Sequence, residues 1–217
     1  MKTDMELKTD ILEELKWEPS IEPAQIGVVV QDGIITLTGY VNRFPEKWEA
    51  ERATQRVAGV KAVANEIEVK LPGYNERTDA EIAHAAVTTL EWNTYVPHDQ
   101  VKVAVENGWI TLTGEVEWHY QKSIAENALR HLNGVRGVVN EITLKPQVTP
   151  AQVKEKIEAA LQRNARLDIK HITVETRDST AILNGYVRSW AEREEVGWAA
   201  WAAPGVTQVE NNITLLN

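Results

Sequence analysis

The sequence repeats one unit of about 70 residues three times, and this repetition constrains the fold more than any other feature. Each copy contains a strand-like run that ends in glycine, at 34–39, 109–114 and 180–185. The three glycines, Gly39, Gly114 and Gly185, are 75 and 71 residues apart (114 − 39 and 185 − 114), and with these offsets the copies align without a gap. We therefore predict three domains, at 3–72, 78–146 and 149–217.

Each copy begins with a helix signal. The segments 3–6, 78–81 and 149–152 place a threonine three residues before Glu or Gln, which is the capping-box pattern. An apolar residue then follows at every fourth position, which marks one face of a helix. These positions are Leu7, Ile11 and Leu15; Ile82, Ala86 and Leu90; and Val153, Ile157 and Leu161. The sequence thus predicts a first helix in every copy, ending near residues 17, 92 and 163.

Two alternating runs follow and predict a hairpin. Asp32-Gly33 and Asn107-Gly108 are strong signals for a two-residue type I′ turn, because both turn positions need positive φ. The third copy has Asp178-Ser179, so we expect a looser third hairpin. The period of two places the glycines at 39, 114 and 185 on the apolar face, where a glycine permits close approach of a helix or marks a bulge.

A second helix and a last strand complete the unit. The small apolar positions of this helix are Ala50, Ala53 and Val57; Ala125, Ala128 and Leu132; and Val196, Ala199 and Ala203. Gly59, Gly134 and Gly205 each precede valine in a C-cap pattern. The resulting order is α-β-β-α-β. We predict an α+β fold in which each unit has a three-stranded mixed sheet with two helices on one face.

Composition limits the function. The net charge of −9 argues against a nucleic-acid partner, which needs a basic surface, and weakens attraction to anionic lipid. No cysteine is present, so thiolate chemistry is excluded. The first residues show no export signal and no run is long enough to cross a membrane, so we expect a cytoplasmic protein, or a periplasmic one if a leader has been removed. Units this small bury little surface, which favours packing on one another or in a homo-oligomer.

Two short patterns carry a resemblance to a known family. One is G-x-x-x-L-x-G-x-V from Gly33 to Val41. The other is G-V-x-x-V-x-N, at 59–65, 134–140 and 205–211. With them the whole chain resembles three tandem BON domains, although the third copy departs from the first pattern at Ser179. The resemblance implies a non-enzymatic module of osmotic-stress and envelope proteins, associated with phospholipid contact and in some members with small ligands.

One asparagine in the last strand recurs in all three copies, as Asn65, Asn140 and Asn211. All three are predicted on the apolar face, where a buried amide must be hydrogen-bonded. We expect each side chain to tie the last strand to backbone near the glycine kink. A role in ligand binding is the alternative.

Aromatic residues between the second strand and the second helix are the functional candidates. They are Phe44, Trp48, Trp118, His119, Tyr120 and Trp190, with Trp198 and Trp201 on the third copy's second helix. Packing between the repeats is the simpler explanation of these rings, and contact with a partner or a lipid surface is the functional one. Trp17 and Trp92, at the end of the first helix, are expected to pack locally.

The sequence offers no catalytic candidate, cofactor signature or metal motif. The five histidines neither recur between copies nor pair at ligand spacing, and no nucleophile and base stand in a known pattern. Three classes of function remain, all non-enzymatic: a peripheral phospholipid-binding module, a protein-interaction scaffold or oligomer, and a sensor of a small ligand or cation that works by domain rearrangement.

Overall fold

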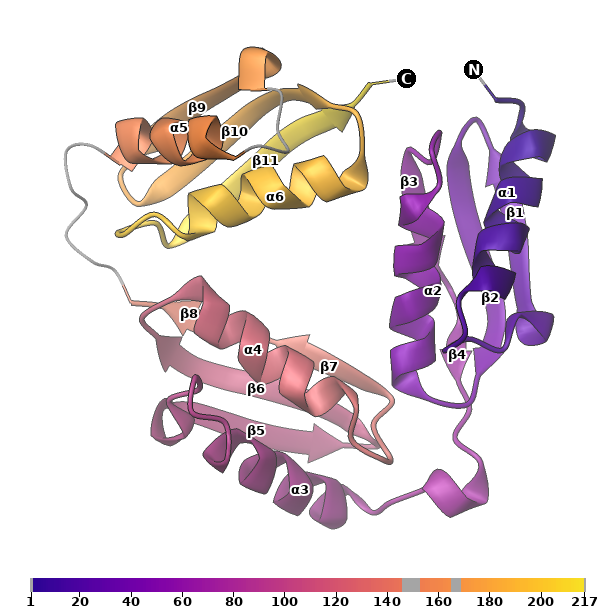
Figure 1. Cartoon of the computed structure of the whole chain (residues 1–217). Helices are drawn as coiled ribbons and strands as arrows, with labels where there is room; N and C mark the ends of the chain where they lie inside the picture. The colour runs from indigo at the N-terminus through magenta and orange to yellow at the C-terminus, as the bar shows by residue number, and fades with distance from the viewer. Residues whose placement is uncertain (1, 146–152, 165–168, 217) are drawn as a thin grey trace. The chain divides into compact units, whose positions relative to one another are not determined.

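The computed structural model describes residues 2–145, 153–164 and 169–216, and each repeat runs helix, strand, strand, helix, strand (Figure 1). Short 3₁₀ turns, η1 (Pro23–Gln25), η3 (His98–Gln100) and η4 (Ile169–His171), lead into the first strand of each repeat, and η2 (Gly73–Asn75) follows the first repeat. The predicted α+β class and the order of elements are confirmed.

The repeats contain corresponding elements. Repeat 1 has α1 (Asp4–Trp17), β1 (Ile26–Gln31), β2 (Ile34–Val41), α2 (Phe44–Arg56), β3 (Ala62–Asn65) and β4 (Glu68–Val69). Repeat 2 has α3 (Asp79–Glu91), β5 (Val101–Glu106), β6 (Trp109–Val116), α4 (His119–Arg130), β7 (Gly137–Asn140) and β8 (Thr143–Leu144). Repeat 3 has α5 (Val153–Arg163), β9 (Ile172–Arg177), β10 (Thr180–Val187), α6 (Trp190–Trp201) and β11 (Gln208–Leu215).

Each sheet is mixed. The second strand lies in the centre, as in the order β1-β2-β3, with the first strand antiparallel and the last strand parallel to it. The last strand is continuous in repeat 3 but divides into two short strands in repeats 1 and 2. The register is the same on both sides of the break, since Ile34 pairs with Ala62 and Tyr40 with Glu68. The break therefore interrupts the ladder without shifting it.

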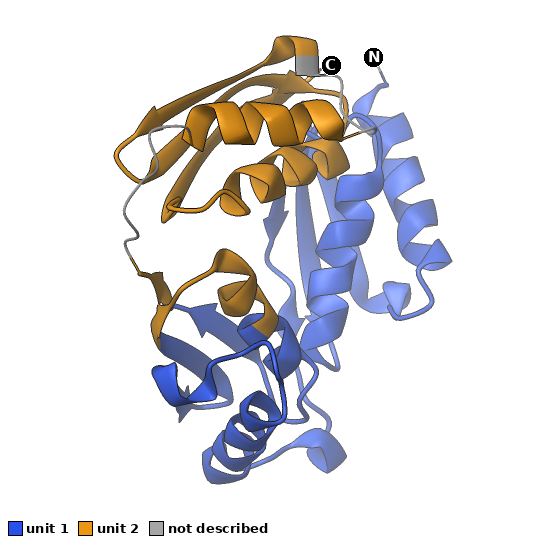
Figure 2. Ribbon diagram, turned by 60° about the vertical axis from the view of Figure 1, so that its left-hand side comes forward, with its two compact units in different colours: residues 1–113, 125–141 blue, residues 114–124, 142–217 orange. Residues whose placement is uncertain are grey.

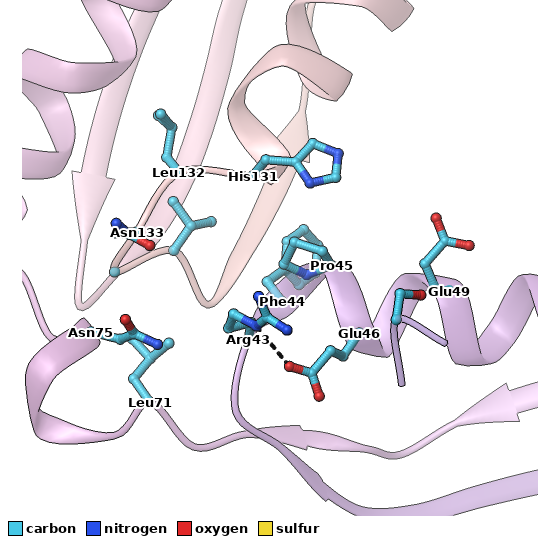
Figure 3. A pocket seen from close by; sticks show the side chains of 13 residues that line it. Arg43, Phe44, Pro45, Glu46, Glu49, Leu71, Asn75, His131, Leu132 and Asn133 are labelled. Atoms are coloured by element: carbon cyan, nitrogen blue, oxygen red, sulfur yellow. Dashed lines mark hydrogen bonds and ion pairs between the residues drawn. The ribbon is translucent and has the colours of Figure 1, made fainter. Parts of the chain in front are cut away.

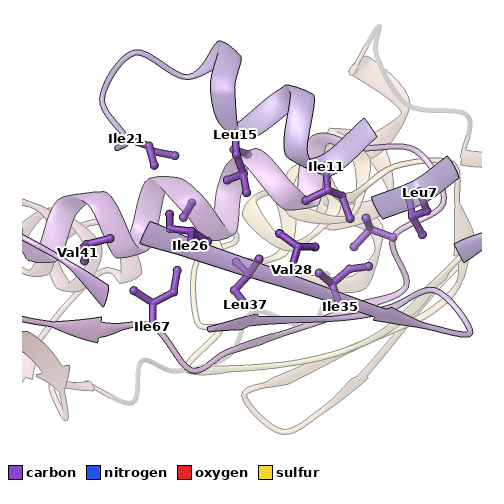
Figure 4. Close-up of a cluster of buried hydrophobic side chains, with 13 residues drawn as sticks. Leu7, Ile11, Leu15, Ile21, Ile26, Val28, Ile35, Leu37, Val41 and Ile67 are labelled. Atoms are coloured by element: carbon purple, nitrogen blue, oxygen red, sulfur yellow. The ribbon is translucent and has the colours of Figure 1, made fainter. Parts of the chain in front are cut away.

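The hydrophobic core of repeat 1 lies between its two helices and one face of its sheet (Figure 4). Leu7, Ile11 and Leu15 of α1 are buried as the four-residue spacing predicts, and they pack with Ile35 and Leu37 of β2. The corresponding stripes of α3 and α5 are buried as well. In the second helix the structure adds buried positions that the spacing did not predict: Thr54, Leu129 and Ala200.

The capping boxes of repeats 1 and 2 are confirmed. Thr3 and Thr78 accept from the backbone N–H of Glu6 and Glu81, and each glutamate accepts from the threonine N–H in return. The third predicted box, at 149–152, lies outside the described residues. The second helix ends earlier than predicted, at Arg56, Arg130 and Trp201. The glycines that follow have positive φ but lie three or four residues beyond the helix, so they are not direct caps.

The hairpin turns also differ between repeats. Asp32 and Asn107 have φ of 52°, and Gly33 and Gly108 have φ of 79°, as a type I′ turn requires. In repeat 3 Asp178 has φ of 51°, whereas Ser179 does not enter the left-handed region. Strand pairing nevertheless begins directly beside the turn in repeat 3, between Arg177 and Thr180.

The expected role of Gly39 is corrected. A side chain at Gly39 would place its Cβ 2.0 Å from the carbonyl oxygen of Gln25, just before β1. At Gly185 the same atom would lie 1.9 Å from the carbonyl oxygen of His171. The close neighbour is therefore the backbone that enters the first strand and not a helix.

Two compact units divide the chain: residues 1–113 with 125–141, and residues 114–124 with 142–217 (Figure 2). The division passes through β6 and α4 of repeat 2. Within residues 2–145, 153–164 and 169–216, no helix combines the length and the apolar character needed to cross a membrane.

Candidate functional site

The strand–helix junction of repeat 1 borders a cavity of about 270 Å³ in the first unit (Figure 3). Phe44 and Pro45, which begin α2, line it together with Leu132 and Asn133, which follow α4. Arg43 donates from Nε to Oε1 of Glu46 over 2.9 Å, so the cation at the rim is already paired. Phe44 is half-buried. The junction therefore forms a mixed polar and apolar hollow rather than an exposed aromatic surface.

Trp48, the second candidate of this junction, contacts two guanidinium groups. The carbon Cζ of Arg52 is 4.6 Å from the ring centroid, and Cζ of Arg130 on α4 is 4.0 Å from it. Both distances are within the range of a cation–π contact. Arg130 is buried and also binds Glu126 over 3.1 Å; burial lowers the pKa of its guanidinium below the ordinary arginine value. Trp48 thus contributes to packing of repeat 1 against α4.

The junction of repeat 2 is more aromatic. In the second unit, a cavity of about 360 Å³ is lined by Trp118, His119, Tyr120, Trp198, Trp201 and Ala202. The His119 ring stacks on Trp201 with centroids 4.0 Å apart and meets Trp198 edge-on at 5.5 Å. Tyr120 is 42% exposed and Trp198 is 48% exposed. No lysine, arginine, aspartate or glutamate is among the described residues that line this cavity.

Trp190 is not among the residues that line this cavity. It begins α6, is half-buried, and has Cζ of Arg193 at 5.4 Å from its ring centroid. The structure therefore brings Trp118, His119 and Tyr120 together with Trp198 and Trp201 of α6, and it leaves the equivalent junction residue of repeat 3 apart. Sequence offsets identify equivalent positions, but a contact between repeats need not join equivalent positions.

The recurrent asparagines join the last strand to the second helix. Asn65 donates from Nδ2 to the carbonyl oxygen of Lys47 (3.0 Å) and accepts from the N–H of Ile67 (3.3 Å). Asn211 makes the same two bonds, to Arg193 O and from Ile213 N, and Asn140 donates to Glu126. The expected hydrogen bonds to backbone are present: the Nδ2 groups of Asn65 and Asn211 reach the second helix, and Ile213, the other partner of Asn211, pairs with Gly185.

The most exposed tryptophans are the two that were expected to pack locally. Trp17 is 83% exposed and Trp92 is 84% exposed, at the ends of α1 and α3. Both lie two residues after a buried leucine, Leu15 or Leu90. Residues two apart do not share a helix face, so this spacing was the signal for an outward side chain.

The comparisons with known proteins agree with the repeated fold. The BON domain model matches residues 3–70, 78–146 and 149–217. The chain belongs to the BON domain family. Osmotically-inducible protein Y of Escherichia coli K12 is 28% identical over 134 residues, covering 58% of this chain and 65% of that protein, which is just under two thirds.

Solved structures of CdsD, a structural protein of the type III secretion system of Chlamydia trachomatis, are also similar. One is 17% identical and covers 100% of both chains; another is 18% identical and covers 97% of this chain and 92% of that one. The TM-score is 0.27 in both cases, so these similarities do not bear on function. Among the described residues of the BON protein, no group of three or more His, Asp or Glu side chains is arranged to hold a metal ion.

Proposed function

We propose that this BON protein is a non-enzymatic binding protein that contacts phospholipid surfaces through the aromatic cavity of its second unit. The observation that carries the proposal is the lining of that cavity by Trp118, Tyr120, Trp198 and Trp201, with no lysine, arginine, aspartate or glutamate among its described lining residues. Tryptophan and tyrosine combine an apolar ring with a polar N–H or O–H, and both are enriched at the boundary between membrane and water. The similarity to an osmotically inducible protein supports a role in osmotic stress.

The charge of the chain and the side chains that line the cavity indicate which lipid headgroups should bind. A net charge of −9 disfavours anionic headgroups, and no lysine or arginine is among the described residues that line the cavity. Binding should therefore favour zwitterionic phosphatidylcholine and should change little with salt, because screening acts on charge–charge attraction. Half-exposed rings such as Tyr120 and Trp198 are accessible for this contact.

Flotation with phosphatidylcholine vesicles tests the proposal. The double variant Trp118→Ser and Trp198→Ser should reduce the bound fraction about tenfold or more, which is the effect of truncating a dominant interface aromatic. Trp190→Ser is the matched control, since Trp190 is a half-buried junction tryptophan outside the cavity. A wild-type protein that does not float, or a folded double variant that floats as well as wild type, would overturn the proposal. Binding that requires anionic lipid and disappears at high salt would also overturn it.

A further inference from the structure

A second aromatic surface lies at the end of α3 of repeat 2 and shares no residue with the aromatic cavity described above. Trp92 is 84% exposed and Tyr95 is 63% exposed. The two rings border an open hollow of about 780 Å³ whose other lining residues are Thr88, Thr89, Asn93 and Thr94. All six side chains are uncharged, although a quarter of the whole chain's residues are charged. We call these six residues the α3-end surface.

The loop that carries this surface is ordered by its own hydrogen bonds. The N–H of Trp92 donates to Thr88 O (3.1 Å), the N–H of Asn93 to Leu90 O (3.1 Å), and the N–H of Val96 to Asn93 O (3.1 Å). The buried Val96 side chain fixes the far end of the loop. The backbone that carries the two rings is therefore preformed, which reduces the entropy lost when a ligand binds.

One hydrogen bond fixes the orientation of the Asn93 side chain. Its Oδ1 accepts from the N–H of Tyr95 (3.1 Å), which leaves Nδ2 pointing away from that bond as a donor. Among the described residues, no group accepts from Asn93 Nδ2, and none bonds to the hydroxyl groups of Thr88, Thr94 or Tyr95. The surface thus combines two exposed aromatic rings with four neutral side chains. Thr88, Asn93 and Thr94 can donate, whereas Thr89, whose hydroxyl already donates to Ala85 O (2.7 Å), can accept.

We propose that the α3-end surface binds a neutral carbohydrate. One face of a pyranose ring carries C–H groups and packs on an indole or phenol ring, while its hydroxyl groups need uncharged donors and acceptors. An ionic ligand would find no opposite charge among the lining residues. A membrane surface is a poorer fit, because the rings are surrounded by threonine and asparagine and not by side chains that enter the acyl region.

Repeat 1 provides an internal control at the corresponding helix end. Trp17 occupies the position of Trp92, but Glu13, Glu14 and Glu18 occupy the positions of Thr88, Thr89 and Asn93. Glu14 and Glu18 bind Arg56 over 2.8 Å and 3.0 Å. Hydrogen bonds from Ser20 and Arg56 keep the pKa of Glu18 below its ordinary value. The exposed indole of Trp17 therefore has charged side chains at the positions of Thr88, Thr89 and Asn93, and it should not bind the same sugar.

Affinity electrophoresis of the full chain tests the proposal. Native gels would contain hydroxyethylcellulose, glucomannan or dextran as neutral probes. We expect retardation in at least one gel, a loss of affinity of about tenfold or more in Trp92→Ala and in Tyr95→Ala, and no change in Trp17→Ala. The triple variant Thr88→Glu, Thr89→Glu and Asn93→Glu should also lose binding. It should fold, because Thr88 is exposed and Thr89 and Asn93 are only half-buried, so the new carboxylates stay in contact with water.

Several outcomes would overturn the proposal. They are the absence of retardation in all three gels, undiminished retardation of Trp92→Ala, and retardation of Trp17→Ala reduced as strongly as that of Trp92→Ala. Loss of vesicle flotation in Trp92→Ala, with unchanged retardation, would assign the surface to lipid instead. The phospholipid proposal can fail without affecting this one, since it depends on Trp118 and Trp198.

Discussion

The hairpin of repeats 1 and 2 is tied to the first helix, and that of repeat 3 is built differently. Asp4 accepts from the turn N–H groups of Asp32 (2.9 Å) and Gly33 (3.2 Å). Asp79 makes the same pair of bonds in repeat 2, over 2.8 Å and 2.9 Å. Repeat 3 has Pro150 at the aspartate position and Ser179 at the glycine position.

This difference indicates that the aspartate and the glycine act together. Positive φ at both turn residues directs two neighbouring N–H groups to one side, where one carboxylate accepts both. In repeat 3, Ser179 lies outside the left-handed region, and its hydroxyl instead accepts from Thr207 over 2.9 Å. The same sheet register is thus reached through two kinds of turn, because the buried apolar face specifies the pairing in each repeat.

The largest predicted effect comes from Gly108→Val in the type I′ turn. A Cβ at this position would lie 2.9 Å from the carbonyl oxygen of Gly134, and valine resists the φ of 79°. We expect a loss of about 3 kcal/mol in the unfolding free energy of repeat 2. Hydrogen exchange of the β5 and β6 amides measures this loss separately from the other repeats.

Ser179→Val is the matched change in repeat 3. It should cost about 1 kcal/mol or less, because it removes one side-chain hydrogen bond without forcing positive φ. Equal losses in the two repeats would contradict the distinction between the two turns.

The recurrent asparagines should contribute unequally. Asn65 donates to Lys47 O and also to Glu51 Oε2 (3.1 Å), whereas repeat 3 has Gly197 at the position of Glu51. Asn65→Leu should therefore lower the unfolding free energy by about 2 kcal/mol, and Asn211→Leu by about 1 kcal/mol, since bonds to charged groups contribute more. Urea unfolding followed by exchange of the β3 and β11 amides compares them. A stable Asn65→Leu protein would show that the amide is not a structural link.

Removing the helix-to-turn carboxylate should have a smaller effect. Asp79→Ala leaves two N–H groups of the turn to water, and because the site is partly exposed we expect a loss of about 1 kcal/mol. Asp79→Asn keeps one acceptor oxygen and should lose less. Asp99→Ala, an exposed aspartate of η3, is the control and should stay within about 0.5 kcal/mol of wild type. Thermal unfolding measures this loss. If Asp79→Ala and Asp99→Ala have the same melting temperature, the hydrogen bonds from Asp79 to the turn do not stabilise the protein.

The smallest predicted effect is on pH dependence. The backbone N–H and then the hydroxyl of Thr78 donate to Glu81 and hold the pKa of its carboxyl below the ordinary glutamate value; Thr3 does the same for Glu6. A lowered folded-state pKa means that this stabilisation is complete above the unfolded pKa and is lost as pH falls through the folded pKa. Repeat 3 has Gln152 at this position and should lack this acid sensitivity.

Carbon-13 NMR titration of the glutamate carboxyl groups measures this shift. Thr78→Val removes the hydroxyl donor and should move the pKa of Glu81 part of the way back toward its ordinary value. An unchanged Glu81 pKa in Thr78→Val would rule out the hydroxyl as a cause.

Short sequence patterns predicted the fold because the interactions they indicate join residues that are close together in the sequence. The capping residues Thr3 and Thr78, the helical stripe at 7, 11 and 15, and the Asp-Gly and Asn-Gly turns each involve residues within a few positions of one another. The candidate site was harder to predict. Trp118 and Tyr120 share a cavity with Trp198 and Trp201, which lie about 80 residues later in the sequence. No periodic pattern in the sequence predicts a contact over that separation.

The sequence by itself determined the three-fold repetition, the α-β-β-α-β order, the buried stripes and the turn residues, since hydrophobic period and backbone preference act over short distances. Only the tertiary structure decided which partners the long-range groups have. The tertiary structure joins Asn65 and Asn211 to the second helix, places Gly39 against the backbone before β1, and brings two arginines against Trp48. It also left Trp17 and Trp92 in solvent, because whether an aromatic ring is covered depends on what the rest of the chain brings over it.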